Sequence, residues 1–457
     1  MRADGVVPDA DLLAGMDWLV DDFAPLADQA LTEDPLAWPG YPAALERARQ
    51  RTGDDQAVTA GRAQCGGHAC MLVAFNFAFM GGSMGEAEGR RIGAAIAVAT
   101  NERLPLVTVL RSGGARMQEG MRSLIQMQRV ARGLTELAAA HLPHVSIVRH
   151  PTTGGVWASL GAAADVILAE EGAEVAFAGS RVRHRTLGGA GAPRLPADTD
   201  STFSAAGQAE NGFIDAVHPG AKLRAQLALL LELLSPTTRG APVLPELPRG
   251  RSTGKLLTGW EQVGRARARG RPTSDDYLRE YFACVFEIHG DRVGGVDPSV
   301  RCGFGHHGGR TIAFIAQSGA STRAAGYRVA RRLVELAGRL QLPILTLIDS
   351  PGADDSAANE AAGVGSAVAD LLRAVAASRV PILSLTIGQG GSGGTLALTS
   401  PDNLWITADG YFSVIAPEAA TAILKCPQDE VPSIASRLRL APEDLEELGI
   451  VRGVVEE

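Results

Sequence analysis

The sequence lacks the features that mark membrane, secreted and disulfide-rich proteins. No apolar stretch without charged residues reaches the roughly 18 residues that a membrane-spanning helix needs. The N-terminal segment carries Asp4 early and has no apolar core, so we expect no signal peptide there. The five cysteines are an odd, scattered set, which argues against a disulfide framework and favours a reducing compartment. These absences predict a cytoplasmic protein without a membrane partner.

Basic charge is also scarce. The formal net charge is −8 and the pI about 5.7, whereas nucleic-acid-binding domains usually have a basic face and a pI above about 9. Lysine is nearly absent, since only Lys222, Lys255 and Lys425 occur among 43 basic residues. The arginine excess suits planar anions such as phosphate, although a GC-rich genome would explain it equally. We therefore expect no nucleic-acid partner.

The size and composition of the chain are those of a two-domain globular protein. It has 457 residues, of which 46% are hydrophobic and 21% charged, and a single core rarely grows beyond about 250–300 residues. Glycine is abundant, with 54 residues, and this surplus is typical of turns and close backbone approaches. The one G-x-G-x-x-G match, residues 388–393, is weak evidence for a dinucleotide site, and no P-loop motif occurs.

The chain repeats itself at long range. The segment PLVTVLRSGGA at residues 105–115 matches PILTLIDSPGA 238 residues later. Four further pairs follow the same order at offsets of 237 to 239: residues 89–93 with 326–330, 143–149 with 381–387, 153–156 with 392–395, and 210–214 with 447–451. We infer two copies of one domain, with boundaries at residues 1–235 and 272–457. The proline-rich and arginine-rich stretch 236–271 is interpreted as a linker with a surface helix.

Each copy shows the pattern of an α/β fold. Short apolar strands are predicted at residues 106–110 and 344–348. Apolar residues at helical spacing predict a helix in each copy, through Met117, Met121, Leu124 and Ile125 in the first and Val329, Leu333, Leu336 and Leu340 in the second. Apolar strands between amphipathic helices favour a parallel sheet, and ligands gather at the carboxyl ends of such strands.

Glycine pairs follow several of the predicted strands: Gly81–Gly82, Gly113–Gly114, Gly154–Gly155 and Gly393–Gly394. Any single pair is explained by a tight turn or close helix packing. As a set, they would aim unhindered backbone amides at one point, where an enolate or thioester oxyanion could be held. No Ser-His-Asp or Cys-His set can be assembled from spacing, so catalysis by backbone amides is favoured over a proton-shuttling side chain.

A zinc site is the alternative interpretation of the CGGHAC segment at residues 65–70. A structural zinc site needs four ligands at suitable spacing, and no second cysteine pair lies nearby. We expect a β-hairpin with buried thiols and no bound metal.

Long, ordered motifs in both copies resemble one enzyme family. The first copy resembles the β subunit of bacterial acetyl-CoA carboxylase carboxyltransferase at residues 75–85 (FNFAFMGGSMG), 112–120 (SGGARMQEG), 151–156 (PTTGGV) and 177–182 (FAGSRV). The second resembles the α subunit at residues 287–292 (EIHGDR), 326–328 (GYR), 348–353 (IDSPGA), 390–396 (GGSGGTL) and 413–418 (SVIAPE). The chain is similar to a β–α fusion, as in single-chain actinobacterial acyl-CoA carboxyltransferases.

The resemblance implies two tandem crotonase (ClpP-type) superhelix domains and an activity. That activity is transfer of CO2 from carboxybiotin, on a separate carrier protein served by a biotin carboxylase, to the α-carbon of an acyl-CoA. For the acetyl-CoA carboxylase type, the product is malonyl-CoA for fatty acid biosynthesis. The family's sites lie where two protomers face each other, so the resemblance also implies a homodimer.

The resemblance further implies roles for individual residues. Gly113 and Gly114 match the amides that hold the enolate oxygen of the thioester, and Gly394 and Thr395 match those that hold an oxygen of biotin. Other matching positions are expected to line the acyl-CoA and biotin clefts: Gly81, Gly82, Arg116, Gly154, Gly155, Gly352, Ala353 and Gly393.

The α-like copy departs from the family pattern in ways that keep other functions open. Asp354, Asp355 and Ser356 replace a Tyr-Pro-Gly segment, Gln389 stands where Glu is frequent, and Thr395 replaces Ala. The β subunit's four-cysteine zinc ribbon is also missing from residues 1–40. One alternative is a biotin-independent malonyl-thioester decarboxylase or a related acyl-thioester enzyme of specialised metabolism. Another is a catalytically inactive binding subunit.

Overall fold

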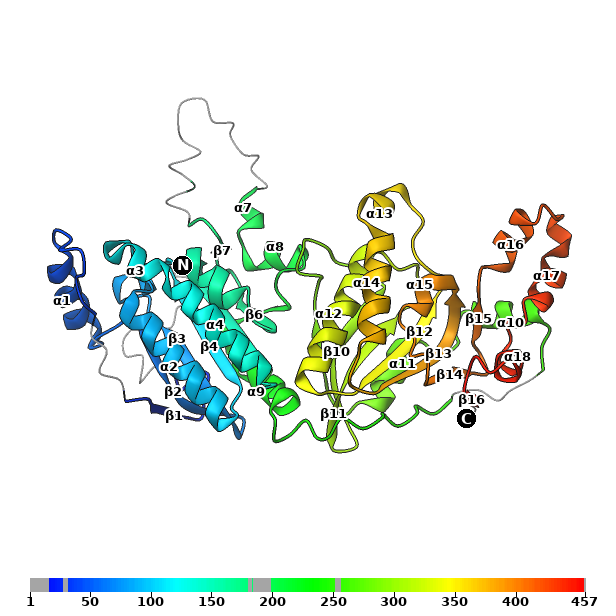
Figure 1. Ribbon diagram of the computed structural model, residues 1–457, viewed down its shortest axis with the longest axis horizontal. Helices are drawn as coiled ribbons and strands as arrows, with labels where there is room; N and C mark the ends of the chain where they lie inside the picture. Colours follow the sequence, from blue (N-terminus) through cyan, green and yellow to red (C-terminus); the bar gives the residue numbers. More distant parts are fainter. Residues whose placement is uncertain (1–15, 28–31, 180–182, 184–198, 251–255, 456–457) are drawn as a thin grey trace, which may run out of the picture. The chain divides into compact units, whose positions relative to one another are not determined.

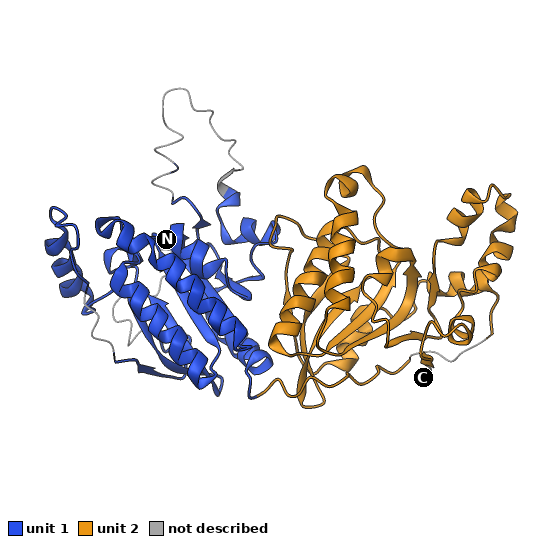
Figure 2. Cartoon of the chain, viewed as in Figure 1, with its two compact units in different colours: residues 1–237 blue, residues 238–457 orange. Residues whose placement is uncertain are grey.

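The computed structural model describes residues 16–27, 32–179, 183, 199–250 and 256–455. The chain divides into two compact units, Met1–Thr237 and Thr238–Glu457 (Figure 2). The N-terminal segment considered for a signal peptide, up to residue 15, and residues 180–182 of the FAGSRV motif lie outside the described residues. Among the described residues, no helix is both long and apolar enough to cross a membrane.

Unit 1 is built on one mixed sheet (Figure 1). The strand order is β1-β2-β3-β4-β5-β6-β8, with β7 paired to β5. Strands β3 to β6 and β8 run parallel, and β1 and β2 complete one edge antiparallel. The strands are β1 (Asp22–Pro25), β2 (Val58–Cys65), β3 (His68–Phe75), β4 (Leu106–Ser112), β5 (His144–Thr153), β6 (Val166–Glu170), β7 (Val175–Ala176) and β8 (Ala216–His218).

Unit 2 repeats this sheet. Its order is β9-β10-β11-β12-β13-β14-β16, with β15 paired to β13, and its parallel part again follows an antiparallel edge. The strands are β9 (Val285–Ile288), β10 (Val300–His307), β11 (Arg310–Gln317), β12 (Ile344–Ser350), β13 (Ile382–Gly391), β14 (Leu404–Thr407), β15 (Tyr411–Ser413) and β16 (Val454–Val455). Both predicted strands are confirmed, as the first residues of β4 and β12.

The two copies agree in irregular details as well. The pairing register shifts between Leu110 and Ser112 on β4, and between Ile348 and Ser350 on β12. An isolated parallel bridge joins Met84 to Ala115 in unit 1, and Thr322 to Ala353 in unit 2. Such coincidences at an offset of 238 confirm the internal duplication.

Two details of the sequence alignment are wrong. The letters pair Gly89 with Gly326, but helices Glu86–Glu102 and Ala324–Leu340 match at an offset of 238, so Gly89 is equivalent to Tyr327. The letters around the Gly154 pair align best at an offset of 239, but Gly154 and Ser392 each open a short helix with positive φ, at 67° and 58°. The structural offset there is 238. Gly155 is therefore equivalent to Gly393, and Val156 to Gly394.

Helices pair over each sheet. In unit 1 they are α1 (Tyr41–Thr52), α2 (Glu86–Glu102), α3 (Met121–Leu124), α4 (Gln126–Ala139), α5 (Gly154–Val156), α7 (Thr199–Thr202), α8 (Ala205–Glu210) and α9 (Gly220–Leu234), with short turns η1 (Met80–Gly82), η2 (Met117–Glu119) and η3 (Trp157–Gly161). Helices α2 and α4 lie side by side (Figure 1). Ile92 and Ile96 of α2 and Val130 of α4 join Leu106 and Leu110 in one buried core, so these helices fix where β4 ends.

In unit 2 the helices are α10 (Gly259–Ala266), α11 (Ser274–Tyr281), α12 (Ala324–Leu340), α13 (Ala357–Ala361), α14 (Val364–Ala376), α15 (Ser392–Leu396), α16 (Pro417–Ile423), α17 (Val431–Arg437) and α18 (Pro442–Glu447), with η4 (Gln428–Glu430). The predicted helix of this copy is confirmed, because α12 buries Val329, Leu333, Leu336 and Leu340.

The predicted helix of the first copy differs from the structure. The region forms two short pieces, η2 and α3, and all four apolar side chains are exposed, Met117 by 72% and Met121 by 69%. Helical spacing of apolar residues predicts that they share a face, but it does not distinguish a buried face from an exposed one.

The arginine-rich stretch before residue 272 packs within unit 2. Helix α10 starts with a capping box in which the Thr258 hydroxyl accepts from the Glu261 amide. Its Val263 and Ala266 lie in one cluster with Tyr411, Ala435 and Leu440. Arg271 follows with an ion pair to Asp349 at the end of β12, at 2.5 Å. The segment interpreted as a linker thus includes a helix of the unit 2 core.

Cys65 and Cys70 lie on the β2–β3 hairpin, as predicted, and both thiols are buried. Burial raises the pKa of Cys65 to about 11 and that of Cys70 to about 12. Both groups are therefore neutral thiols at physiological pH.

Candidate active site

Unit 1 carries a cavity of about 1090 Å³ at the carboxyl ends of its central strands. The loops after β3 and β4 and the end of β5 line it, through Gly81, Gly113, Ala115 and Thr153 among others. Three arginines line the same space: Arg51, Arg111 and Arg116. This is the position at which a parallel α/β sheet is expected to bind ligands.

Glycines approach one another closely beside this cavity, and Gly81 and Gly113 among them line it. A β-carbon placed on Gly154 would lie 3.1 Å from Gly114 Cα, and one placed on Gly114 would lie 3.4 Å from Gly154 Cα. Gly113 approaches Gly81 O in the same way, at 3.5 Å. Gly114 and Gly154 also have positive φ values of 108° and 67°, which L side chains rarely adopt. Three of the four predicted glycine pairs are thus brought together in unit 1.

The amides of Gly113 and Gly114 are already used within the protein. Gly113 N donates to Gly81 O at 2.9 Å, and Gly114 N donates to Ser112 Oγ at 3.1 Å. The Ser112 hydroxyl in turn donates to Gly82 O at 2.6 Å. These bonds tie the loop after β4 to the turn that contains Gly81 and Gly82. The residues predicted as anion donors therefore shape the cavity with amides that have internal partners.

Other amides at the same place have no such bond. Gly114 O and Arg116 N both bond to Met84, so the amide of Ala115 between them points away from Met84. No partner for that amide occurs within the described ranges. The amides of Gly155 and Val156, the second and third residues of α5, precede the first intrahelical hydrogen bond.

Arg116 lines this cavity as well, and the role expected for it stays a prediction. Its side chain is 0% exposed and is enclosed by two carboxylates. Nη2 lies 2.5 Å from Glu88 Oε1 and donates to Ser83 O at 2.6 Å, while Nη1 lies 3.3 Å from Glu119 Oε1. Arg116 therefore ties together the loops beside the cavity through bonds within the protein.

The same network includes helix α1 and the start of α2. Tyr41 OH donates to Glu119 Oε1 at 2.7 Å, and Glu119 Oε2 accepts from the Glu86 amide at 2.6 Å. Glu88 Oε2 accepts from the Gly85 amide at 2.9 Å. Burial raises the pKa of Tyr41 above its ordinary value, against the lowering effect of Arg116, so the phenol is a permanent donor. One buried polar cluster thus connects α1, the start of α2 and the loop after β4.

Unit 2 repeats the glycine geometry with different residues. Gly352, with φ 131°, is equivalent to Gly114, and its amide donates to Ser350 Oγ at 3.1 Å. A β-carbon on Gly352 would lie 3.0 Å from Gly391 O, and one on Gly394 would lie 2.7 Å from Ala353 N. The predicted residues Gly352, Ala353, Gly393, Gly394 and Thr395 thus meet where β12 and β13 end.

Thr395 is fully buried, and its hydroxyl donates to Ser392 O at 3.1 Å. It is the fourth residue of α15, where intrahelical hydrogen bonds normally begin. The helix-start amides of unit 2 are therefore better represented by Gly393 and Gly394. The hydroxyl that distinguishes Thr395 from Ala therefore makes its hydrogen bond within α15.

The Asp354–Ser356 segment forms a capped turn. Asp354 Oδ1 accepts from the Ser356 amide at 2.8 Å, and Ser356 Oγ accepts from the Asn359 amide at 3.3 Å to cap α13. Gln389 Oε1 accepts from Arg267 Nε at 3.0 Å. Despite these departures, Gly352 keeps the positive φ of Gly114, and Ala353 keeps the bridge that Ala115 makes in unit 1.

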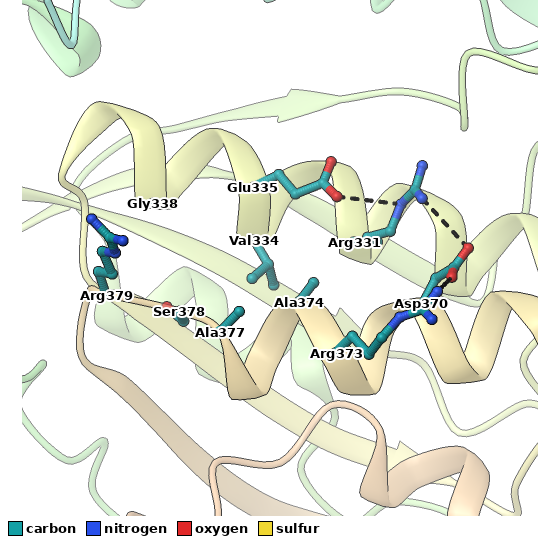
Figure 3. Close-up of a pocket in the computed structure, with 10 residues that line it drawn as sticks. All are labelled: Arg331, Val334, Glu335, Gly338, Asp370, Arg373, Ala374, Ala377, Ser378 and Arg379. Carbon is teal, nitrogen blue, oxygen red and sulfur yellow. Dashed lines mark hydrogen bonds and ion pairs between the residues drawn. The ribbon is translucent and has the colours of Figure 1, made fainter. Parts of the chain in front are cut away.

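A second hollow, of about 440 Å³, lies between α12 and α14 (Figure 3). Several of its charged side chains pair with one another: Arg331 Nη1 lies 3.5 Å from Asp370 Oδ2, and Arg331 Nε lies 3.7 Å from Glu335 Oε1. It contains none of the predicted site residues, and we interpret it as an ion-paired surface groove.

Family models match both units. Residues 249–457 match the model described as acetyl co-enzyme A carboxylase carboxyltransferase-like, and residues 41–195 match the carboxyl transferase domain. A Salinispora arenicola protein named acetyl-coenzyme A carboxylase carboxyl transferase subunits beta/alpha is 38% identical over 98% of this chain and 82% of its own length. The chain belongs to the carboxyltransferase family of biotin-dependent acyl-CoA carboxylases.

A further relative and a solved structure are similar to this chain. A Mycobacterium bovis protein named as a probable biotin-dependent acyl-coenzyme A carboxylase beta3 subunit is 32% identical over 93% of this chain and 85% of its own length. The crystal structure of transcarboxylase 12S superimposes with a TM-score of 0.78 at 19% identity, covering 96% of this chain and 86% of that one. The predicted tandem crotonase-type fold is confirmed.

Sequence reasoning missed the serines that hold both glycine loops. Ser112 and Ser350 occupy the same position in the two copies, and each accepts from the amide two residues later. The signal was present, because serine is one of the few residues that the two aligned segments share. Tyr327 lies within the GYR motif, but the motif alone indicates no role for its hydroxyl.

Proposed function

We propose that this protein is the carboxyltransferase component of a biotin-dependent acyl-CoA carboxylase, acting on acetyl-CoA and yielding malonyl-CoA. The main observation behind this proposal is shared by both copies. A glycine loop at the end of β4 or β12 lies against the first backbone amides of a short helix, α5 or α15. That geometry suits an oxygen that becomes negative during reaction, because fixed donors need no reorientation. The cytoplasm, where malonyl-CoA would serve fatty acid synthesis, is the expected compartment.

We assign the unit 1 cavity to the acyl-CoA. The guanidiniums of Arg51 and Arg111 suit the phosphates of coenzyme A. The amides of Ala115 and Gly155 would hold the thioester oxygen as negative charge develops on it, while Gly113, Gly114 and Gly154 leave room for the thioester. Stabilising that charge makes the α-carbon nucleophilic. Gly81 and Gly82 support the loop that carries these amides, and Arg116, which lines the same cavity, holds the loops beside it.

The unit 2 residues fit a biotin ring. Space is open around Gly393, since a β-carbon there would meet no atom within 4 Å. The amides of Ala353, Gly393 and Gly394 would receive the ring's carbonyl oxygen, with Gly352 and Thr395 shaping the turn. When bound, carboxybiotin supplies the activated carboxyl group. We expect it to arrive on a separate carrier protein that a biotin carboxylase has loaded, and no metal is required.

We also propose that two copies of the chain pair. Met117, Met121, Leu124 and Ile125 are exposed beside the unit 1 cavity, where Met117 itself lines the wall. Exposed apolar side chains gathered at one place mark interaction surfaces. A homodimer would cover them and bring a second copy to the cavity.

The test is carboxyl exchange between malonyl-CoA and free biocytin by the purified protein. We expect biocytin-dependent formation of acetyl-CoA, with propionyl-CoA and methylmalonyl-CoA as the comparison pair for acyl-chain selectivity. Release of CO2 from malonyl-CoA without biocytin would replace this proposal with the decarboxylase alternative. A dimer that neither turns over nor binds acyl-CoA would replace it with a binding subunit.

A further inference from the structure

Tyr327 is a fully buried tyrosine whose hydroxyl is not satisfied. It lies on the first turn of α12, and its side chain is 0% exposed. Within the described part of the chain, the hydroxyl oxygen has no hydrogen-bond partner of good geometry. Burial raises the phenol pKa and the nearby Thr322 hydroxyl lowers it; that hydroxyl accepts from Gln317 Nε2 at 3.0 Å. A buried polar group without a partner costs stability and calls for an explanation.

The hydroxyl is aimed at the start of α15. A β-carbon placed on Gly394 would lie 2.6 Å from Tyr327 Oη and 2.7 Å from Ala353 N. Two donors therefore converge beside Gly394 from different elements, α12 and the loop after β12. The Ala353 amide points there because its neighbours, Gly352 O and Asp354 N, both bond to Thr322. No acceptor for that amide occurs among the residues that the structure describes.

The fold does not need a tyrosine here. Helices α2 and α12 are equivalent at an offset of 238, and the residue equivalent to Tyr327 is Gly89. In unit 1 the space above Gly89 is filled by Gln126, whose Oε1 would lie 2.5 Å from a β-carbon on that glycine. An apolar side chain could fill the corresponding space in unit 2. Packing therefore explains the ring of Tyr327 but not its hydroxyl.

The phenol is a donor at every physiological pH. Burial raises its pKa above the ordinary value, against the lowering effect of Thr322. A neutral donor fixed beside unpaired amides is the arrangement that stabilises a developing oxyanion.

We propose that Tyr327 is a catalytic residue of unit 2, whose hydroxyl donates a hydrogen bond to the carbonyl-type oxygen received by the Ala353 and Gly394 amides. This inference rests on the proposed function, which assigns that oxygen to the biotin ring. Unit 1 has no counterpart, so the two oxyanion sites differ in one side-chain donor.

The test compares Tyr327→Phe with Tyr281→Phe. Tyr281 is another buried tyrosine of unit 2, but its hydroxyl donates to Glu246 O at 2.8 Å. For Tyr327→Phe we expect an unchanged or higher Tm, an unchanged Kd for acyl-CoA, at least 10-fold weaker biocytin binding by calorimetry, and at least 10-fold slower exchange. For Tyr281→Phe we expect a lower Tm with biocytin binding and exchange unchanged.

The outcomes separate this inference from the proposed function. A wild-type protein that binds biocytin without exchanging carboxyl groups would refute the proposed function, and weaker biocytin binding by Tyr327→Phe would still support the donor role. Equal biocytin binding by Tyr327→Phe and the wild type would overturn the inference, as would a lower Tm combined with wild-type exchange. Absence of biocytin binding by the wild type would overturn both.

Discussion

Arg116 and Glu88 form an ion pair from which water is excluded on both sides. Nη2 of Arg116 lies 2.5 Å from Glu88 Oε1, and neither side chain exposes any surface. The pair links the loop after β4 to the first turn of α2. Because both charges are buried, each depends on the other for compensation.

Arg116→Met is therefore expected to destabilise unit 1 strongly. Removing one partner of a buried ion pair costs about 3–5 kcal/mol, since it leaves an uncompensated charge, and here Glu119 loses its partner as well. Urea denaturation followed by circular dichroism would measure the loss. Arg122→Met is the control, because Arg122 is exposed in its 3.2 Å pair with Glu86 and should cost under about 1 kcal/mol. Equal losses in both variants would contradict the assigned role.

Gly114→Val is expected to lower kcat for carboxyl exchange by about 100-fold or more, the effect of losing an oxyanion donor. The added side chain would meet Gly154 Cα at 3.4 Å and is strained at φ 108°, so it would displace α5 and its amides. Steady-state kinetics and the Tm should be measured together. Gly93→Ala in α2 is the control, as its β-carbon meets nothing within 4 Å. It should retain activity and gain about 0.5–1 kcal/mol. A Gly114→Val enzyme with wild-type kcat would rule out the role proposed for this loop.

Alkaline pH is expected to weaken the fold through two thiols. Unfolded cysteines lose protons near pH 9, whereas Cys65 and Cys70 in the folded state retain theirs up to a pKa of about 11 and about 12. The folded state then binds more protons than the unfolded state, so the free energy of unfolding falls as pH rises above 9. The slope is at most about 1.4 kcal/mol per pH unit for each thiol.

Urea titrations between pH 8 and 10 would detect this fall. A Cys65→Ala, Cys70→Ala double variant has the same tyrosines but not these thiols, so its stability should depend less on pH. Identical slopes for the two proteins would show that the thiols do not contribute.

Met121→Glu is expected to weaken self-association. Met121 is 69% exposed on α3, and burying an introduced carboxylate in an apolar interface is costly. Sedimentation velocity should show a shift toward monomer together with lower exchange activity. Leu448→Glu is the matched control, since Leu448 is 49% exposed after α18 in unit 2. A Met121→Glu protein that stays dimeric at micromolar concentration would exclude this face from the interface.

The fold was largely predictable because the internal duplication is visible in the amino-acid sequence. Segments such as residues 105–115 and 343–353 match position by position, and two equivalent sheets follow from that match. The alignment failed by one residue at Gly154, because Ser392 adopts the positive φ that a glycine would be expected to supply. Backbone conformation, which decides structural equivalence, is only loosely encoded by residue type.

The site was harder to predict, because glycine patterns identify where backbones approach but not where their amides point. Gly113 and Gly114 were correctly placed beside Gly154, yet their amides bond to Gly81 O and Ser112 Oγ. Arg116 has the character of an anion ligand in the sequence, because its fully buried partner Glu88 lies 28 residues away on α2. Such pairings depend on three-dimensional neighbours that spacing along the chain does not report.

The serine bonds beneath each glycine loop have a thermodynamic consequence. Ser112 joins Gly114 to Gly82, and Ser350 joins Gly352 to Ala320, so both loops are ordered by the protein alone. The conformational entropy of the two loops is therefore lost when the protein folds. Substrate binding then does not have to order these loops, so it costs less conformational entropy. Affinity and turnover should then respond weakly to loop dynamics, and association should approach the rate of simple encounter.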